Sequence, residues 1–343
     1  MSFKRLDQED IVISADSITA PAWTGNATQL TAFYTSSNQR NSISGEYYFN
    51  VYNAAVGTGT EAIQFSVGFG NRYGSGSAAL NSDATLISYT PSRIIYGQYR
   101  TLVNGTEDTD ISFGTGTPDS IYGISIERAR YKEKLFPGSL SLTLTTGTGT
   151  IHLTDNSNYV TTETFTDAGR VYNIISGSAG TRTSSPLDSG NLGYATGSIG
   201  SYGLLLPDAG LILLNGDALD ATVAGGGIAL GTSVGSTDGE NPAKLVDAMN
   251  AGDNFVLRSE ETVSSNYVFV RARNSEFNYS TNPSNITGSG ELTHNIMIDS
   301  PQAYITAVGL YNDNNDLLAV AKLSRPLLKD FTKEALIRIK LDY

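Results

Sequence analysis

The sequence predicts a mostly β protein, built from antiparallel, sandwich-like sheets in one or two β domains with a few short helices. Its 343 residues include 36 Gly, and Ser, Thr and Asn recur throughout, a mixture that favours turns and polar strands over long helices. The 19 Tyr outnumber the 12 Phe and the single Trp together, and Tyr suits half-buried strand faces and wet interfaces. Alternating apolar and polar segments are frequent, whereas only two segments carry helix start and stop signals.

Five strands are expected in the N-terminal part of the chain. The segment DIVISADSITAPAW alternates until Pro21, and GEYYFNVYNAA and AIQFSVGFG read as two strands joined by a Gly- and Thr-rich loop. IYGISI begins another strand with one apolar face, and SLSLTLTT follows the turn signal Pro137-Gly138 as a further one. We take residues 1–145 as an N-terminal β-rich domain that carries an extended N-terminal arm.

The middle region, residues 146–203, is rich in Gly, Ser and Thr, and we interpret it as an insertion or loop region with one strand at Val171–Ile175. Residues 204–343 are expected to form a C-terminal β-rich domain. It begins with two short strands around the turn Pro207–Gly210.

The end of the chain is expected to be a hairpin followed by one more strand. YITAVGLY and LLAVAKLS pair across NDNND in this interpretation, and EALIRIKLDY closes the chain. In the preceding strand NYVFVRA, Val268, Val270 and Ala272 share one side. The apolar residues of the last strand, Ala335–Lys340, do not alternate cleanly, so we expect a structural strand buried on more than one face.

Two helices are predicted. TPSRIIYGQYRTLVNG has Thr90 as its N-cap, Pro91 as its first residue and Gly105 as its stop. NPAKLVDAMNAG is expected to be capped by Asn241, to begin at Pro242 and to end at Gly252.

Charge and composition exclude several classes of function. The 34 Asp and Glu exceed the 22 Lys and Arg, which gives a net charge of −12 that opposes general nucleic-acid binding. The chain contains no Cys, so disulfides, thiolate nucleophiles and Cys-based metal sites are excluded. No apolar signal-peptide region or membrane-length apolar stretch is present, and we expect a protein made in a cytoplasm with no membrane partner.

Catalytic motifs are weak. GTSVG matches the nucleophile-elbow pattern with Ser233 as nucleophile, but a loop follows it where a helix is required, and we favour a Gly-rich turn. The two histidines, His152 and His294, form no ligand pair and are expected at the surface or in turns. Paired carboxylates for glycoside hydrolysis stay open, because the spacing that matters for them is spatial.

Two further loops resemble ligand sites. Gly68–Gly74 has the spacing GxGxxxG, which differs from the dinucleotide fingerprint, and we interpret it as a flexible hairpin tip. Asp313–Asp316 supplies oxygen ligands but lacks the central Gly and the distant Glu of a calcium loop, and we interpret it as a turn. We therefore expect no catalytic, cofactor or metal site.

Two segments are candidate interfaces with other subunits. The run of residues 127–134 interleaves both signs, through Glu127, Arg128, Arg130, Lys132 and Lys134. It fits either a solvated crossing or protected sheet edge, or a charged strand that pairs with a neighbour. The arm from Phe3 to Trp23 contains the only Trp, a frequent interface anchor; it either reaches a partner chain or adds an edge strand to its own domain.

Three groups of segments resemble a known family. They are RLDQEDIVISADSITAPAWTGN, ISIERARYKEKLFPGSLSLTL, and NSEFNYSTNPSN with YITAVGLYNDNNDLLAVAKLSRP. They are similar to a family of virion structural proteins of contractile-tailed, myovirus-type phages that infect cyanobacteria. The resemblance spans nearly the whole chain, least in the middle region. It implies a non-enzymatic, multi-copy component of the tail or baseplate, assembled in the host cytoplasm as a homo-oligomer with other phage structural proteins as partners.

Three alternatives remain beside that expectation. One is a neck or head component or decoration protein of the virion. Another is a receptor- or carbohydrate-binding tail module, for which Tyr47, Tyr48, Tyr52 and Tyr73 are the aromatic candidates. The third is a hydrolase of host envelope polymer.

Overall fold

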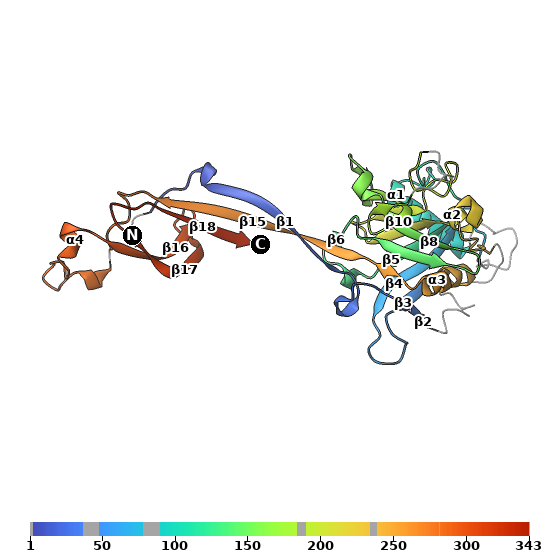
Figure 1. Cartoon of the computed structure of the whole chain (residues 1–343), viewed down its shortest axis with the longest axis horizontal. Coiled ribbons are helices and arrows are strands. Elements are labelled where there is room, and N and C mark those ends of the chain that lie inside the picture. The colour runs from blue at the N-terminus through green and yellow to red at the C-terminus, as the bar shows by residue number, and fades with distance from the viewer. Residues whose placement is uncertain are drawn as a thin grey trace. The chain divides into compact units, whose positions relative to one another are not determined.

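The protein is mostly β, as the sequence predicts, with 41% strand and 18% helix. The computed structural model describes residues 3–36, 48–77, 90–183, 190–233, 239–280 and 282–342 (Figure 1). Contacts divide the chain into two compact units. Unit 1 combines residues 1–17 with residues 262–343, and unit 2 comprises residues 18–261. The units do not coincide with the boundaries 1–145, 146–203 and 204–343 expected from the sequence, because unit 1 is assembled from both ends of the chain.

Unit 2 is built on a large antiparallel sheet that curls into a half-barrel. Its strands follow the order β14-β7-β8-β10-β12-β13-β5-β4-β3-β2, and the short β9 and β11 pair with β10 outside this path. Their bounds are β2 Tyr34–Thr35, β3 Tyr48–Tyr52, β4 Ile63–Asn71, β5 Ser120–Ile126, β7 Ser141–Thr145, β8 Thr150–Asp155, β9 Thr164–Thr166, β10 Gly169–Ser178, β11 Thr181–Arg182, β12 Gly203–Leu206, β13 Leu211–Asn215 and β14 Phe255–Val256.

The middle region of the sequence supplies central strands of this sheet. The expected strand Val171–Ile175 is confirmed as part of β10, which pairs with both β8 and β12. β8 was not expected, and the interpretation of residues 146–203 as loop or insertion is wrong for these segments. Polar residues on the β8 side of the pairing, such as Thr154 and Asp155, are buried and hydrogen-bonded, so they give no hydrophobic signal.

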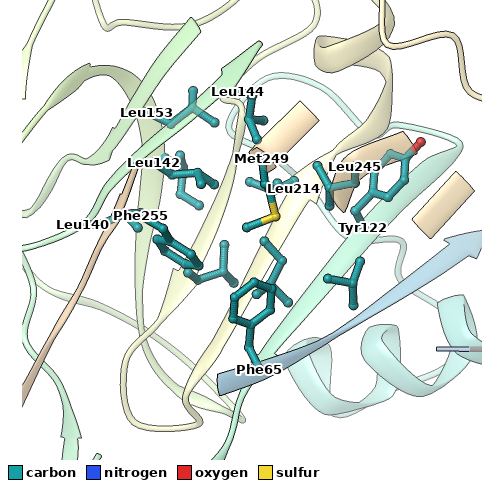
Figure 2. Close-up of a cluster of buried hydrophobic side chains, with 14 of the residues drawn as sticks. Phe65, Tyr122, Leu140, Leu142, Leu144, Leu153, Leu214, Leu245, Met249 and Phe255 are labelled. Carbon is teal, nitrogen blue, oxygen red and sulfur yellow. The ribbon is translucent and has the colours of Figure 1, made fainter. Parts of the chain in front are cut away.

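Apolar side chains cover both faces of the sheet. On one face, Leu245 and Met249 of helix α3 (Glu240–Gly252) pack among Phe65, Leu142 and Phe255, as Figure 2 shows. The opposite face has its own cluster, which includes Tyr96 and Val103 of helix α1 (Pro91–Asn104) with Ile121, Leu204, Leu206, Leu211 and Leu213. β5 and β13 therefore bury side chains on both faces, whereas the sequence predicts only one apolar face for the segment IYGISI.

Both predicted helices form. α1 follows Thr90, begins at Pro91 and ends before Gly105, whose φ of 68° is the left-handed conformation that glycine adopts most easily. The start of α3 differs from the prediction, because the N-cap is Gly239 and the expected cap Asn241 lies inside the helix. The Asn241 side chain accepts from the Ser233 amide at 2.7 Å and donates to the Ser233 carbonyl at 3.0 Å, so it fixes a neighbouring loop. Two short helices, α2 Gly216–Asp220 and α4 Ile296–Asp299, complete the set in the described residues.

Glycine in β4 lets α1 approach the sheet closely. A Cβ atom added at Gly70 would lie 2.9 Å from the backbone nitrogen of Tyr96, which is closer than real Cβ contacts allow. The interpretation of Gly68–Gly74 as a flexible hairpin tip is therefore wrong for Gly68–Asn71, which belong to a strand covered by a helix.

We expect Gly70→Ala to destabilise the protein by about 1–3 kcal/mol, since α1 would have to move away from the sheet. Gly97→Ala is the matched control, because Gly97 lies in α1 with no atom within 4 Å of the new Cβ. The control should stabilise the helix by roughly 0.5–1 kcal/mol. Denaturant titrations followed by circular dichroism measure both, and equal shifts of the same sign would contradict the close-approach argument.

Unit 1 contains the ends of the chain and two small sheets. The chain leaves it within β1 (Ile11–Pro21) and returns within β15 (Arg258–Ala272). β15 lies between β1 and β18 (Ala335–Asp342), and within unit 2 it pairs with β6 (Lys134–Leu135). The predicted terminal hairpin is confirmed as β16 (Ala303–Tyr311) paired with β17 (Leu317–Lys329), and a bulge accommodates Pro326.

Candidate docking surface

Unit 1 has a small core. Its apolar cluster consists of the buried residues Val268, Ile337 and Ile339, with eight partly buried apolar residues packed against them. Ala272 and Ala335 are also buried. β18 alternates cleanly, because Ile337 and Ile339 are 8% and 5% exposed whereas Leu336 is 66% exposed. The expectation that β18 is buried on more than one face is therefore wrong. One face of the strand fills the core, and the other carries exposed side chains.

The exposed face of the β15–β18 pair is aromatic and basic. The register places Tyr267 opposite Lys340, and Phe269 opposite Arg338. The Arg338 guanidinium lies 5.5 Å and the Lys340 ammonium 5.8 Å from the centre of the Tyr267 ring, so two cations contact one aromatic ring. Such contacts are worth about 0.5–1 kcal/mol each at exposed sites.

Acidic partners hold Lys340 in its charged form. Its ammonium lies 3.1 Å from a carboxylate oxygen of Asp342 and 3.5 Å from one of Asp16. The hydrogen bond to Asp342 raises the pKa of Lys340, and the hydrogen bond from the Ser265 hydroxyl, followed by that from Lys340, lowers the pKa of Asp342. Arg338 forms no ion pair with the described residues and carries a free positive charge on the strand.

The β16–β17 hairpin also exposes apolar side chains. Tyr304, Leu318 and Val320 are 65%, 68% and 60% exposed. Near the end of β16, Phe3 packs edge-on against Tyr311 with ring centres 5.2 Å apart, and Phe3 is itself largely exposed. Scattered exposed apolar residues are normal, but their density on these short strands is typical of a surface that contacts another molecule.

A buried lysine orders the loop after β15. Lys329 is fully buried, and its ammonium donates to the Asn274 carbonyl, the Asn278 side-chain oxygen and the Asp330 carbonyl at 3.0, 2.7 and 3.0 Å. These three acceptors match the three N–H donors of an ammonium group. Lys329 therefore has a structural role, and nothing in its surroundings leaves it open to a substrate.

The structure places the side chain of Trp23 in the core of unit 2. The indole is 2% exposed, its N–H donates to the Phe255 carbonyl at 2.7 Å, and its ring centre lies 4.8 Å from that of Phe255. The extended arm of which it is part adds β1 as an edge strand beside β15. Of the two arrangements expected for the arm, a partner contact or an edge strand of its own chain, the structure shows the edge strand.

The charged run of residues 127–134 is not a continuous strand. Arg128–Arg130 form a 3-10 turn, and only Lys134 belongs to a strand, the two-residue β6. The charges have partners inside the chain: Lys132 pairs with Glu261, and the Lys134 ammonium lies 3.6 Å from a Glu260 oxygen.

The two arginines of this run also contact neighbours in the chain. Arg128 stacks on Tyr131 at 4.7 Å, and Arg130 donates to the Thr24 hydroxyl. The hydrogen bond between the Glu127 amide and the Gln64 carbonyl, at 3.0 Å, ties the start of the run to β4. These contacts match the expected solvated crossing more closely than a free charged strand.

Ser233 lacks the surroundings of a catalytic nucleophile in the described residues. Residues 228–233 form neither strand nor helix, and α3 begins only at Glu240. Val234 and Gly235 of the same motif lie outside the described residues. Of the histidines, His152 lies on β8 with its Nδ1 3.0 Å from the Thr143 hydroxyl, and His294 is exposed beside α4.

The Asn- and Asp-rich segment before β17 is a turn, as expected. The Asn312 side-chain oxygen accepts from the amides of Asn314 and Asp316 at 3.0 and 2.8 Å, and Asn315 adopts a left-handed φ of 68°. Within the described ranges, no group of three or more His, Asp or Glu residues could hold a metal ion.

The described aromatic candidates for a glycan site are divided between strand β3 and the turn after β4. Tyr48 and Tyr52 lie on β3, and Tyr73 is 57% exposed with the Arg72 guanidinium 5.0 Å from its ring. Tyr47 lies outside the described residues.

An ion pair in unit 2 links the β12–β13 turn to β10. Asp208 accepts from the Arg170 guanidinium at 2.8 and 3.3 Å and from the Arg170 amide at 2.8 Å. Partial burial acts to raise the pKa of Asp208, but the hydrogen bonds and charge of Arg170 outweigh it and leave the pKa below its usual value. The contribution to stability is therefore present above the unfolded-state pKa of about 3.9 and is lost as the pH falls through the lower folded-state value.

We expect Asp208→Asn to lower the stability of the protein by about 0.5–1 kcal/mol at pH 7, since the pair is partly exposed. The difference from the wild type should shrink as the pH falls from about 4 through the lower folded-state pKa of Asp208, because the carboxylate is protonated first in the unfolded and then in the folded wild type. Thermal melts of both proteins across this range measure the effect. Asp313→Asn, in the exposed turn before β17, removes one carboxylate in the same way and is the control; at pH 7 it should melt like the wild type.

Comparisons with known proteins add no relative: no protein-family model, curated protein or solved structure matches the chain. Among the described residues, none of the helices has the length and apolar character needed to cross a membrane.

Sequence reasoning missed the surface that unit 1 presents. The signal was present in β1, where Ile11, Val12 and Ile13 follow one another and cannot all face the core of a single sheet. A break in alternation of this kind indicates apolar residues that lie outside the core.

Proposed function

We propose that the chain is a non-enzymatic structural component of a phage virion, at the tail or baseplate, that acts by self-assembly and by docking to neighbouring subunits. The observation that supports this function best is the composition of unit 1. Its apolar cluster has only three buried members, whereas many large apolar side chains on its strands are exposed. A surface of this kind gains stability when another subunit covers it.

The resemblance to virion proteins of contractile-tailed phages supplies the biological setting of the proposal. The net charge of −12 supports a position away from packaged DNA, since phosphate contacts require Lys and Arg. Large exposed strands in a small sheet are also suited to joining the sheet of a neighbour, a common mode of protein docking.

Immunogold labelling of purified particles with an antibody against unit 2 tests the proposal. We expect label at the tail or baseplate. Label on the neck or capsid would favour the head or neck alternative, and particles that carry no label would overturn a virion role. Adsorption of the purified protein to host cells or to a glycan array would favour the receptor-binding alternative, with Tyr73→Ala as the first variant to examine.

A further inference from the structure

We propose that the two edges of the small sheet in unit 1 pair with each other between copies of the chain, so that β1 of one copy joins β18 of the next. The inference rests on the proposed assembly role, because it names the partner that covers this surface. Within the described residues, the order β1-β15-β18 leaves β1 and β18 each hydrogen-bonded to β15 alone. Each therefore presents one row of backbone donors and acceptors to its surroundings.

β1 lacks the features that protect an edge strand. Natural edges carry Lys, Pro or a bulge to prevent pairing with other chains. In unit 1 this strand has neither Lys nor Pro, and it exposes Ile11, Val12 and Ile13 to 42%, 49% and 75%. Consecutive exposed β-branched residues on a free edge are a strong template for strand addition.

The charges around the two edges are of opposite sign. Asp7, Glu9, Asp10 and Asp16 lie beside or within β1, and residues 7–17 contain no Lys or Arg. β18 carries Arg338 and Lys340 against Asp342 at its end. In the described residues, neither Glu9 nor Arg338 forms an ion pair, so each has a charge to offer to a neighbour.

These charges select the pairing between unlike edges. Two β1 edges would bring acidic residues such as Glu9 together, and two β18 edges would bring two Arg338 side chains together, which is unfavourable in both cases. Joining β1 to β18 places opposite charges side by side. The lengths also match, because the unit 1 part of β1, Ile11–Ser17, and the eight-residue β18 differ by one residue.

Pairing of unlike edges has a consequence for assembly. A contact between two different surfaces leaves one free β1 and one free β18 at the ends of every assembly. Copies therefore add head to tail until the rotation between them closes a ring, or they continue as a filament. Head-to-tail addition of identical copies suits a multi-copy component, and all the contacts it requires are made by copies of this chain.

Two full-length variants, each blocked at one edge, test the inference by sedimentation velocity over a concentration series. Ile13→Lys places a charge on the exposed β1 edge, and the double variant Leu336→Glu/Arg338→Glu makes β18 acidic. All three residues are exposed, so both proteins should fold like the wild type, which thermal melts can verify. We expect the wild type to self-associate beyond the dimer and each variant alone to associate at least about tenfold more weakly.

The mixture of the two variants decides the arrangement. The Ile13→Lys chain retains an intact β18 and the double variant retains an intact β1, so together they should form 1:1 dimers and nothing larger. Dimers formed by either variant alone would show that like edges pair and would overturn the inference. A wild type that stays monomeric at every concentration would overturn it as well, and particles that still carry the protein would then leave the proposed function standing.

Leu318→Lys is the matched control. Leu318 is 68% exposed on β17, in the other sheet of unit 1, and the substitution adds the same charge away from both edges. We expect it to associate like the wild type. An equal loss of association in this control would show that charge anywhere on unit 1 is sufficient, which would overturn the assignment to the edges.

Discussion

Replacing Trp23 with alanine is expected to destabilise unit 2 by about 3–5 kcal/mol, the usual range for removing a large buried aromatic side chain. Trp23 is 2% exposed and packs between Phe65 and Phe255, with ring centres 6.1 and 4.8 Å away. Its removal also leaves the Phe255 carbonyl without the indole donor. Because whole domains are stable by only about 5–15 kcal/mol, this single change should be visible as a large loss of stability.

Urea titration followed by circular dichroism measures the change, and Trp23→Phe is the control. The phenylalanine keeps most of the apolar contact and loses the hydrogen bond, so it should cost less than the alanine. As the only Trp, the wild-type residue should also emit with the blue-shifted fluorescence of a buried indole. An alanine variant with the wild-type midpoint would contradict a core role and return Trp23 to the list of interface anchors.

Sequence patterns predicted which segments form strands and helices better than they predicted which segments pack against one another. Alternation found β15, and short apolar runs beside turn signals found β12, β13 and the terminal hairpin. Pro91 and Gly105 predicted the ends of α1, because both residues act through their own backbone conformation and can be recognised from the sequence alone. These patterns depend only on residues that are near one another in the sequence, and they predicted the elements whose conformation is set by such residues.

Long-range pairing explains what the sequence did not predict. Trp23 contacts Phe255, which is 232 residues away in the sequence. No local pattern shows that a residue just after the arm's strand packs in the core of unit 2. Asn241 has the composition of a helix cap but bridges to Ser233, since the cap position falls on Gly239. β8 escaped detection because hydrogen bonds satisfy its buried polar residues, a property that depends on the partner strands.

The candidate surface was hidden for a related reason. Charged residues drew attention to residues 127–134, yet Lys132 and Lys134 find acidic partners in the same chain. Ile11, Val12 and Ile13 of β1 are apolar and Arg338 of β18 lies over an aromatic ring, so none of them stands out as a charged run, and only the sheet order shows that both strands lie on free edges. Which strands occupy the edges depends on topology, and the sequence alone leaves topology open.

Deleting β18, from Ala335 onward, is expected to unfold unit 1 and to leave unit 2 folded. The deletion removes Ile337 and Ile339, two of the three buried members of the unit 1 apolar cluster, and it leaves β15 without β18 as a partner over Ser265–Ala272. Fully burying one such side chain contributes about 1.5–3 kcal/mol, so a core this small cannot lose two of them. Unit 2 has separate apolar clusters on its sheet, and none of their buried residues belongs to β18.

Hydrogen exchange read by mass spectrometry separates the two units in one experiment. Peptides from β15 beyond Thr262, from β16 and from β17 should lose protection in the truncated protein, whereas those from β5, β10 and β13 should keep it. Ile339→Ala and Leu336→Ala are the matched point variants on the same strand, 5% and 66% exposed. The first should cost about 2–5 kcal/mol in unit 1, because it leaves a cavity, and the second should cost little. Unchanged protection of β16 and β17 after the deletion would show that the hairpin is stable without β18, and would remove β18 from the core of unit 1.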